Sequence, residues 1–359
     1  MSTPLKGRGT GLAPPNRFAR QHAENVDDGW PQDPDEFLGA PGAPRTKVHP
    51  DKAKRVLTTN NSPDIFFEQS LNPYQGCEHG CIYCYARPSH AYHGLSAGLD
   101  FETQIFAKHD AARLLEAELS RPGYQCKPIM LGANTDPWQP IERDLRITRA
   151  VLEVLVRTRH PLHVITKGAG VLRDIDLLAD LAKDGLTSVF ISLPTLDDAI
   201  KRVLEPRAAS PGARLRIIEA LSGVGVPVGV MVAPVIPVLT DHEMESILQT
   251  AKAAGAQRGA YILLRLPREV KDLFRDWLAQ HFPLTAAHVM AQVQDLRGGR
   301  DNDSAFGTRM SGMGPVADLI KKRFEVACRK WGLATGRGAS LDCSRFQKPV
   351  TLSPQMSLW

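Results

Sequence analysis

The chain has 359 residues, of which 43% are hydrophobic and 23% are charged, and its formal net charge is +5 at pH 7. A chain of this length and composition can bury a sizeable core, and it contains no apolar run of about 18 residues that would span a membrane. Residues 1–18 lack the apolar stretch of a signal peptide, so we expect a cytoplasmic protein that does not enter the membrane.

The cysteine content and the charge narrow the class of protein further. Six cysteines in 359 residues are too few for a disulfide scaffold, and three of them fall within eight positions, which indicates metal binding rather than cross-linking. The mild positive charge fits an anionic substrate such as nucleic acid, but many enzymes that act on neutral metabolites are equally basic.

Residues 1–60 form the first distinct segment of the chain. They are rich in Pro, Gly, Asp, Arg and Asn and show no sustained apolar periodicity. This composition predicts a flexible or loosely wrapped N-terminal extension that precedes the folded core.

Short apolar runs begin near residue 65 and alternate with amphipathic stretches. The runs are rich in β-branched residues and nearly continuous, which is typical of strands buried on both faces of a parallel sheet. The first run contains Pro73, which cannot donate a ladder hydrogen bond. We expect strands at residues 71–76, 129–131, 163–166, 188–192, 226–232 and 261–264.

Helical periodicity lies between these runs. Apolar residues recur at helical spacing in 147–155, 171–182, 211–223 and 241–254, and Asp241 is placed to cap the last of these helices. About six alternating strand and helix units imply right-handed crossovers and a parallel sheet. Such an α/β series closes into a full or partial barrel or stays open, and in each case the active residues lie at the carboxyl ends of the strands.

The pattern changes again near the C-terminal end of the core. Helices are expected at 285–296 and 315–331, and the loop between them carries three arginines and five glycines. This loop either closes over the mouth of the sheet and binds phosphate or carboxylate, or it is an ordinary flexible connection. The chain therefore divides into an extension at 1–60, a core domain at 61–283, and a helical and irregular region at 284–359 that covers the barrel.

Three cysteines, Cys77, Cys81 and Cys84, form a CxxxCxxC motif. Three thiolates on one short loop can reach three irons of a cubane 4Fe–4S cluster, and because the motif has no fourth cysteine, the fourth iron stays open to an exogenous ligand. A structural zinc site is an alternative, with His79 or His90 as the fourth ligand. Buried cysteines without any metal are a further alternative.

The motif and its flanks resemble a known family. CxxxCxxC with an aromatic residue, Tyr83, before the third cysteine resembles the signature of the radical SAM superfamily. The surrounding NPYxGCxHxCxYCYAR resembles the branch related to spore photoproduct lyase, often labelled DNA repair photolyase-like. The same branch resemblance includes the early RGxG, the segment TDPWQPxE at 135–142 and the closing QMSLW.

This resemblance implies a partial (β/α)6 TIM-like barrel of the radical SAM type that holds a 4Fe–4S cluster and S-adenosylmethionine (SAM). It implies that the reduced cluster cleaves SAM to methionine and a 5′-deoxyadenosyl radical, which takes a hydrogen atom from the substrate. A flavodoxin or a ferredoxin-type protein would supply the low-potential electron. The resemblance leaves the substrate open among a nucleic acid lesion, a peptide and a small anion.

The family places SAM contacts at strand ends that correspond to particular positions of this chain. After the second strand, Asn134, Thr135 and Asp136 replace the usual Gly-Gly-Glu that holds the SAM amino group, and a plain Asp-Pro turn is the alternative. Ser192 matches by position the polar residue that contacts the SAM ribose, although satisfied buried serines are common. Lys167, after the third strand, either contacts the cofactor or an anionic substrate, or is a solvated lysine.

The resemblance also implies an arginine for the SAM carboxylate, because a guanidinium grips a carboxylate bidentately. We expect Arg207 in this role, with Glu205 orienting it and Arg214 as the neighbouring candidate, and a plain surface ion pair is the alternative. Tyr83, inside the motif, is expected beside the cofactor.

Spore photoproduct lyase uses a cysteine as hydrogen donor, so Cys343 is a candidate for that role, with a packed structural cysteine as the alternative. The resemblance thus implies a radical SAM enzyme, of lyase or oxidoreductase type, that acts on an unknown substrate. The competing functions are nucleic acid lesion repair by the same chemistry and, in another class, a zinc-stabilised binding module without catalysis.

Overall fold

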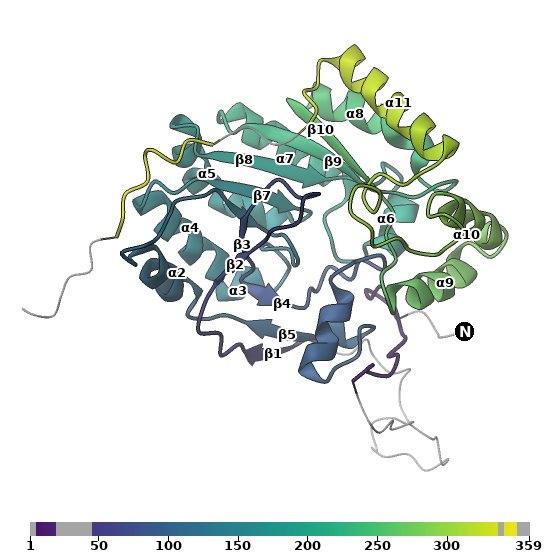
Figure 1. Cartoon of the computed structure of the whole chain (residues 1–359), viewed down its shortest axis with the longest axis horizontal. Coiled ribbons are helices and arrows are strands. Elements are labelled where there is room, and N and C mark those ends of the chain that lie inside the picture. The colour runs from purple at the N-terminus through teal and green to yellow at the C-terminus, as the bar shows by residue number, and fades with distance from the viewer. Residues whose placement is uncertain (1–4, 19–44, 337–340, 350–359) are drawn as a thin grey trace, which may run out of the picture.

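The computed structural model describes residues 5–18, 45–336 and 341–349. Its larger sheet has seven strands in the order β10-β9-β8-β7-β6-β3-β2 (Figure 1). Strand β2 is antiparallel to β3, and all other neighbours are parallel. The strands are β2 (Leu57–Thr59), β3 (Gln69–Leu71), β6 (Ile129–Leu131), β7 (Leu162–Thr166), β8 (Thr187–Ser192), β9 (Val228–Val235) and β10 (Arg258–Leu263).

The six parallel strands have the same order in the chain and in the sheet. Each connection must carry the chain back before the next parallel strand can start, so the sheet winds in one direction and helices cover it. The edge strands β2 and β10 do not pair with each other within the described residues, so the barrel is partial and open on one side. The expected α/β fold with a partial (β/α)6 barrel is confirmed.

Helices fill the connections and extend beyond the last strand. The start of α7 shows why its sequence is helical: the Ser210 hydroxyl accepts a hydrogen bond from the amide of Ala213 (3.2 Å), and Pro211 occupies the first turn, where no amide donor is needed. The α-helices are α1 (Asp100–Thr103), α2 (Ala111–Leu119), α3 (Glu142–Leu145), α4 (Ile147–Arg157), α5 (Ile175–Lys183), α6 (Asp198–Leu204), α7 (Pro211–Gly223), α8 (Met244–Ala253), α9 (Val270–His281), α10 (Ala286–Asp295) and α11 (Pro315–Trp331). The 3₁₀ helices are η2 (Arg87–His93), η3 (Ala169–Asp174) and η4 (Asp241–Glu243).

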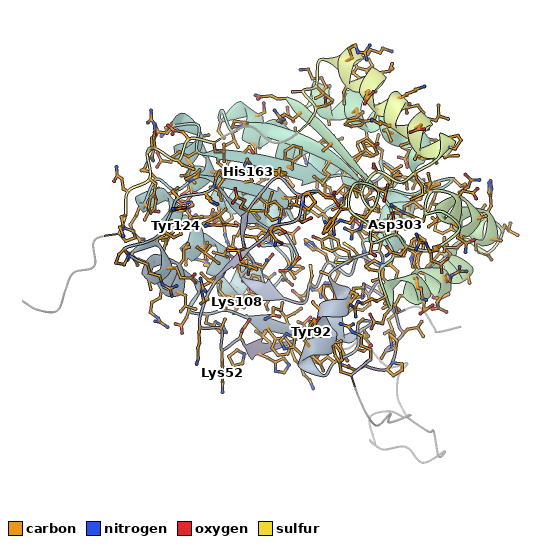
Figure 2. All side chains as sticks on the ribbon, in the orientation of Figure 1. Lys52, Tyr92, Lys108, Tyr124, His163 and Asp303 are labelled. Atoms are coloured by element: carbon orange, nitrogen blue, oxygen red, sulfur yellow. The ribbon has the colours of Figure 1, made fainter. Side chains whose placement is uncertain are left out.

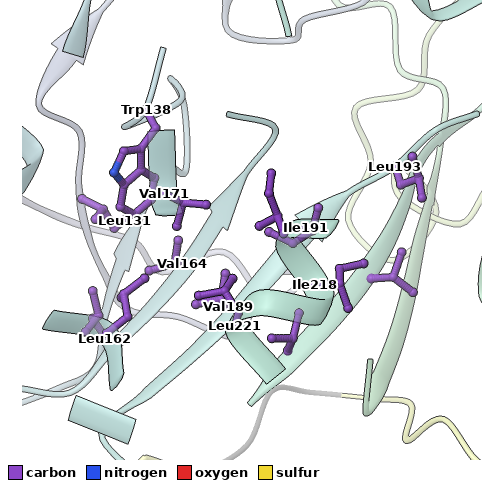
Figure 3. Packing of buried hydrophobic residues seen from close by; sticks show 14 of the residues in the cluster. Leu131, Trp138, Leu162, Val164, Val171, Val189, Ile191, Leu193, Ile218 and Leu221 are labelled. Carbon is purple, nitrogen blue, oxygen red and sulfur yellow. The ribbon is translucent and has the colours of Figure 1, made fainter. Parts of the chain in front are cut away.

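The main core lies between the parallel strands and the helices that cover them (Figure 3). Val164 of β7, Val189 and Ile191 of β8 and Leu178 of α5 are fully buried. Burying one such aliphatic side chain contributes roughly 1.5–3 kcal/mol. The apolar runs of the sequence therefore become the central strands, because both of their faces meet other apolar side chains.

A second, smaller sheet has the strand order β1-β5-β4, with β1 (Lys47–Pro50), β5 (Gln104–Ala107) and β4 (Tyr74–Gln75). Strands β1 and β2 both lie in the segment that the sequence assigned to a flexible extension. That assignment is wrong for these residues, because their backbone groups pair with β5 and β3.

Residues 5–18 also pack on the core instead of remaining apart from it. The amide of Gly9 donates to Glu102 Oε2 (2.9 Å), and the carbonyl of Leu12 accepts from the amide of Leu99 (2.8 Å). These bonds place the beginning of the described chain against the segment that precedes β5.

The strand expected at 71–76 is divided between the two sheets. Leu71 ends β3 in the larger sheet, and Tyr74 begins β4 in the smaller one. Pro73 stands between them and has no amide hydrogen to donate, so neither ladder continues through it.

The expected cap at Asp241 is also wrong. Asp241 lies inside η4 and makes no capping side-chain hydrogen bond, and α8 starts three residues later. Its carboxylate instead lies 3.6 Å from the guanidinium of Arg323 on α11. The side chain of Asp241 therefore pairs with a distant helix instead of capping α8.

The loop between α10 and α11 lies across the open side of the barrel. Its Met310 carbonyl accepts from the amide of Leu263 in β10 (3.0 Å), and Arg309 Nε donates to Asp64 Oδ2 (2.6 Å), which precedes β3. The buried Arg297 donates to the carbonyls of Leu263 and Arg309. The loop is therefore fastened to both edges of the sheet.

A second apolar cluster joins α9 and α10 across the expected boundary at residue 283. It includes Leu273, Trp277, Val289 and Val293, so the two helices share one core. No helix of the described part of the chain combines the length and the apolar composition that crossing a bilayer requires.

Candidate functional site

The three cysteines of the motif lie on the loop that follows β4. The loop turns at Gly76, whose φ of 81° is the left-handed conformation that glycine tolerates. Two backbone bonds hold it: the amide of Cys77 donates to the carbonyl of Phe101 (2.9 Å), and the amide of Ile82 donates to the carbonyl of Leu204 (3.2 Å). The loop therefore lies beside the carboxyl ends of the parallel strands, where α/β proteins place their sites.

A buried ion pair supports the cysteine loop. Arg87 and Glu102 are both fully buried, with Nη2 and Oε1 2.6 Å apart. Arg87 also donates to the carbonyls of Cys81 and Gly98, both at 2.9 Å, and the second oxygen of Glu102 accepts from the amide of Gly9. Because neither charge reaches water, its partners must all come from the protein, and this network fixes the backbone of the second cysteine.

The three thiols are free; those of Cys77 and Cys81 are buried and that of Cys84 is partly exposed. Burial, and then the charge of Glu205, raises the pKa of Cys81 well above its ordinary value, while burial and then Cys77 raise the pKa of Cys84. Bound iron would offset this rise, because it stabilises the thiolates directly. Three soft sulfur donors on one loop fit an iron–sulfur cluster.

Each of the two histidines considered as a fourth zinc ligand has a polar contact within the protein. His90 Nε2 lies 2.8 Å from the carbonyl oxygen of Gln104, and burial lowers the pKa of His90 to about 4. His79 Nδ1 lies 3.4 Å from Asp136 Oδ2. Burial favours a lower pKa for His79, but Asp136 and Cys77 outweigh burial and raise it to about 9.

In the described part of the chain, no three His, Cys, Asp or Glu side chains converge on a point that would hold one metal ion. A zinc ion needs such convergence, whereas a cubane cluster does not, because each thiolate binds a different iron.

A chain of buried hydrogen bonds runs from the motif to β8. The hydroxyl of Tyr83 donates to Glu205, which forms an ion pair with the fully buried Arg214. Arg214 Nη1 donates to the carbonyl of Ser192 (2.8 Å), and Cys81 Sγ lies 3.9 Å from Glu205 Oε1. The expected contact residues Tyr83 and Ser192 are therefore parts of one network beside the second thiol.

Glu205 does not orient Arg207, contrary to the expectation. Arg207 Nη1 donates to Glu78 Oε1 (2.9 Å), and the hydroxyl of Thr46 donates to the same oxygen (2.6 Å). Because Glu205 is already paired with Arg214, Arg207 pairs with the acidic residue inside the motif. The guanidinium of Arg207 therefore lies against the cysteine loop and keeps a partly exposed edge.

The segment after β6 meets the same end of the sheet. Asn134 is exposed, and its amide donates to Asn72 Oδ1 (2.9 Å). The hydroxyl of the buried Thr135 donates to the carbonyl of Tyr74 (2.7 Å). These contacts tie the segment to the residues that lead into the cysteine loop.

Asp136 connects this segment to β7 and to the motif. Its Oδ2 accepts from the amide of Lys167 (2.7 Å) and faces His79, and its Oδ1 accepts from the hydroxyl of Thr166 (2.7 Å). Burial opposes ionisation of Asp136, but His79 and these bonds outweigh it and lower the pKa of Asp136 to about 2. The carboxylate is a permanent anion inside the protein.

The Lys167 ammonium lies within the electrostatic reach of the second cysteine. Burial favours a lower pKa for Lys167, but the charges of Cys81 and Glu205 outweigh it and raise the pKa. The structure therefore gathers most of the expected site residues around the cysteine loop: Tyr83, Thr135, Asp136, Lys167, Ser192 and Arg207.

Cys343 is not brought together with these residues. Cys343 lies beside Cys126, and Cys126 belongs to the segment that precedes β6. Phe346, three residues after Cys343, packs on Tyr124 of the same segment with ring centroids 5.5 Å apart. In Figure 2, Tyr124 and Asp303 of the α10–α11 loop appear on opposite sides of the molecule. The thiol of Cys343 thus lies near the amino ends of the strands, whereas a hydrogen donor has to contact the substrate.

Sequence reasoning missed the residues that hold the loop in place, chiefly Arg87, Glu102 and Glu78. Arg87 was visible in the CYCYAR run, but its acidic partner is 15 positions away on another element. Arginine is rarely buried. Its presence three residues after Cys84, beside a loop expected to be buried, was the one signal in the sequence that a buried acidic partner was needed.

A family model described as the Radical SAM superfamily matches residues 71–251, or 181 of the 359 residues. The match contains the cysteine loop and extends from the end of β3 into α8.

Curated relatives are similar over part of the chain. An uncharacterized protein of Mycobacterium tuberculosis is 36% identical over 225 residues, which cover 62% of this chain and 66% of that protein. An uncharacterized protein of Methanocaldococcus jannaschii is 25% identical over 232 residues, which cover 65% of this chain and 82% of that protein. The chain thus spans just under two thirds of the length of the mycobacterial relative.

Solved structures of spore photoproduct lyase share the fold. The complex with dinucleoside spore photoproduct has a TM-score of 0.58 at 16% identity, covering 80% of each chain. A mutant of that enzyme with bound AdoMet and the dinucleoside has a TM-score of 0.55 at 15% identity, with the same coverage.

Proposed function

The chain belongs to the radical SAM superfamily, whose cofactors are a 4Fe–4S cluster and SAM, and we propose that Cys77, Cys81 and Cys84 hold that cluster. One observation carries this proposal: three free thiols share a single loop at the carboxyl end of a parallel sheet. The other described cysteines lie on other elements. Three protein thiolates would leave one iron of the cluster open to SAM.

The chemistry proposed is reductive cleavage of SAM. When bound, the cluster would supply the low-potential electron for this cleavage, and SAM would supply the carbon radical that removes a hydrogen atom from the substrate. The chain itself places the reactants and excludes water. In this role Arg87 and Glu102 hold the backbone of the cysteine loop, and Glu205 and Arg214 hold Tyr83 against it.

Side chains at the strand ends are proposed to hold SAM. In this proposal the exposed Asn134 after β6 binds the amino group, Ser192 at the end of β8 binds the ribose, and Arg207 binds the carboxylate. The partly exposed edge of the Arg207 guanidinium supports that role. Lys167 would contribute positive charge to the same pocket.

Thr135 and Asp136 are proposed as positioning residues for this site. Their side chains are committed to Tyr74 and to His79, so they hold the end of β6 against the cysteine loop. Cys343 lies with Cys126 at the amino ends of the strands, so its role as hydrogen donor has no support from this geometry.

The proposal includes partners and a setting. A flavodoxin or ferredoxin-type protein would deliver the low-potential electron, and a cytoplasmic location suits such a donor. The reaction would be of lyase or oxidoreductase type. The division at 1–60, 61–283 and 284–359 is retained as a description of extension, catalytic core and cover, with β1 and β2 assigned to the core.

Repair of a nucleic acid lesion is the second candidate function. It is supported by the fold shared with spore photoproduct lyase in complex with dinucleoside spore photoproduct. Nucleic acid binding would show a steep loss of affinity with salt, because Lys and Arg contacts to phosphates release counterions. Affinity for lesion-bearing DNA that is no higher than for intact DNA would argue against this candidate.

Anaerobic reconstitution tests the main proposal. The protein is loaded with iron and sulfide, its iron content per chain is measured, and it is then given dithionite and SAM. We expect 5′-deoxyadenosine and methionine in equal amounts. A loaded protein that forms no 5′-deoxyadenosine, or a colourless protein that retains one zinc and no iron, would overturn it.

A further inference from the structure

The guanidinium of Arg265, just after β10, forms no ion pair within the residues that the structure describes. Arg265 is half-buried, its buried Nε atom has no hydrogen-bond partner, and its Nη1 donates to Met310 Sδ at 3.5 Å. Thioether sulfur is a weak acceptor, and no carboxylate in the described part of the chain forms an ion pair with Arg265. Buried charges are normally paired, and Arg265 departs from this rule. Its guanidinium therefore has N–H donors that are available to a ligand.

The neighbouring cations are compensated in other ways. Arg309 forms an ion pair with Asp64 at 2.6 Å, and the buried Arg297 donates to the carbonyls of Leu264 (2.7 Å) and Arg309 (2.9 Å). Burial, and then the charge of Arg309, lowers the pKa of Arg265. The region therefore gathers three arginines, and among them the buried Nε of Arg265 has no hydrogen-bond partner.

Arg265 faces the cysteine loop. Its guanidinium carbon lies 5.8 Å from the ring centroid of Tyr85, which is the residue after the third cysteine. The hydroxyl of Tyr85 in turn donates to the carbonyl of Ala133, just after β6. A group bound to Arg265 would therefore lie next to the loop that we propose to hold the cluster.

A rim of further cations surrounds a cavity whose lining begins at Leu266, the residue after Arg265. A cavity of about 470 Å³ is lined by residues that include Arg268, Lys271, Arg275 and Arg300. Asp301 is paired with Arg275 at 2.7 Å, whereas the other three cations form no ion pair within the described residues. Arg268 and Lys271 also stand at the start of α9, where a helix disfavours cations and favours anions.

We propose that Arg265 binds a phosphate group of the substrate and that the rim of Arg268, Lys271 and Arg300 binds its further negative charge. The inference rests on the proposed function, since it takes the mouth beside the cysteine loop as the substrate site. A planar guanidinium presents parallel N–H donors that match two oxygens of such a group. The substrate is therefore a phosphorylated compound with more than one negative charge.

Binding to the reconstituted holoenzyme tests the proposal with two probes, pyrophosphate and a short mixed-sequence single-stranded oligodeoxynucleotide, at one fixed ionic strength. Arg265→Gln should weaken binding of at least one probe by about tenfold or more, because a charge-assisted hydrogen bond is lost. Arg265→Lys should weaken it less, because the charge remains while the fork is lost. Arg113→Gln is the matched control, since Arg113 is an exposed, ion-paired arginine on α2, which Figure 1 shows on the other side of the molecule from α9 and α10.

The two probes separate the sources of the phosphate. Arg265-dependent binding of pyrophosphate identifies a free phosphorylated compound, and Arg265-dependent binding of the oligonucleotide alone identifies a nucleic acid backbone; both support the proposal. Failure of the wild type to bind either probe, or equal effects of the Arg265→Gln and Arg113→Gln variants, would overturn it. Cleavage of SAM by Arg265→Gln with dithionite and no substrate is measured in parallel, so a failed anion site is distinguished from a failed radical generator.

Discussion

The body of the parallel sheet and the mouth at its carboxyl end are built from opposite kinds of side chain. In the body, Val164, Val189 and Ile191 are fully buried among other apolar residues. At the mouth, two ion pairs are fully buried, one between Arg87 and Glu102 and one between Glu205 and Arg214. The body is stabilised by removing apolar area from water, whereas buried ions must offset a large desolvation cost.

This contrast indicates what each region contributes. Burying a charge is a poor way to add stability, and replacing a buried pair with apolar residues is often neutral. Charges that persist beside the cysteine loop therefore serve to position groups, and we expect changes in the mouth and in the body to have separable effects. Iron content and SAM cleavage report on the mouth, and the free energy of unfolding reports on both.

The largest effect is expected for Cys81→Ala. Loss of one thiolate should lower the iron content per chain and abolish 5′-deoxyadenosine formation, because the two remaining thiolates cannot hold the cluster in the site. Cys343→Ala is the matched control and should keep both, since Cys343 lies at the other end of the strands. Formation of 5′-deoxyadenosine by reconstituted Cys81→Ala would contradict the ligand assignment.

Arg87→Met should cost about 3–5 kcal/mol of unfolding free energy, because it leaves the carboxylate of Glu102 buried without its partner. It should also lower the iron content, because Arg87 holds the carbonyl of Cys81. Denaturant unfolding and iron analysis give the two readouts. The double variant Arg87→Met, Glu102→Leu should regain part of the stability, and a double variant less stable than Arg87→Met would show that the pair is not coupled in this way.

Leu178→Ala tests the body of the sheet. Removing a fully buried side chain of α5 should cost about 2–5 kcal/mol through lost burial and a cavity. The iron content per chain of the folded fraction should not change, and Leu178→Met should cost under about 1.5 kcal/mol. If Leu178→Ala lost as much iron as Arg87→Met, the effects of changes in the body and in the mouth would not be separable.

The buried His160 makes the unfolding free energy depend on pH. It is fully buried between the hydroxyl of Tyr124 and the carbonyl of Pro161, and burial lowers the pKa of His160 to about 4. In the unfolded chain the pKa of His160 is near 6.5, so the unfolded state binds a proton before the folded state does. The stabilisation by neutral, buried His160 is therefore complete above pH 6.5 and is lost as the pH falls toward 4. The loss is at most about 3 kcal/mol.

The corresponding test compares His160→Gln with His109→Gln, whose histidine is exposed. Unfolding free energies measured from pH 7 to pH 4 should fall less steeply for His160→Gln than for the wild type, and His109→Gln should follow the wild type. Identical slopes for the wild type and both variants would mean that burial of His160 does not control the pH dependence.

The smallest effect is expected for Ser210→Ala. Loss of the bond from the amide of Ala213 to the Ser210 hydroxyl should cost about 1 kcal/mol, as for other helix N-caps. Iron content and SAM cleavage should remain as in the wild type. Ser210→Asp, which restores an acceptor, should recover the stability measured by thermal unfolding, and no difference between the two variants would show that the cap contributes nothing.

Local patterns predicted the parts of the fold that depend on neighbours in the chain. The apolar runs around Val164 and Val189 became parallel strands, and the periodic stretch at 211–223 became α7 with the same bounds. The strand expected at 71–76 failed because Pro73 divides it between two sheets. The cap expected at Asp241 failed because Arg323, on a distant helix, attracts its carboxylate.

The candidate site followed the same division. The spacing of the three cysteines predicted their grouping, because residues three and four positions apart on one loop are close in any compact conformation. The partners of the arginines could not be predicted in this way. In the fold, Arg207 pairs with Glu78 and Arg214 pairs with Glu205. The sequence alone does not show which arginine pairs with which acid.

The amino acid order specified the cysteine loop, the succession of strands and helices, and the family that they indicate, since each depends on short-range spacing and hydrophobic periodicity. The folded arrangement was needed to show that residues 5–18 lie against the segment before β5, that Arg87 has a buried acidic partner, and that Arg265 forms no ion pair within the described residues. Such pairings join residues far apart in the chain, and their energies depend on distance and burial, which exist once the sheet has brought the segments together.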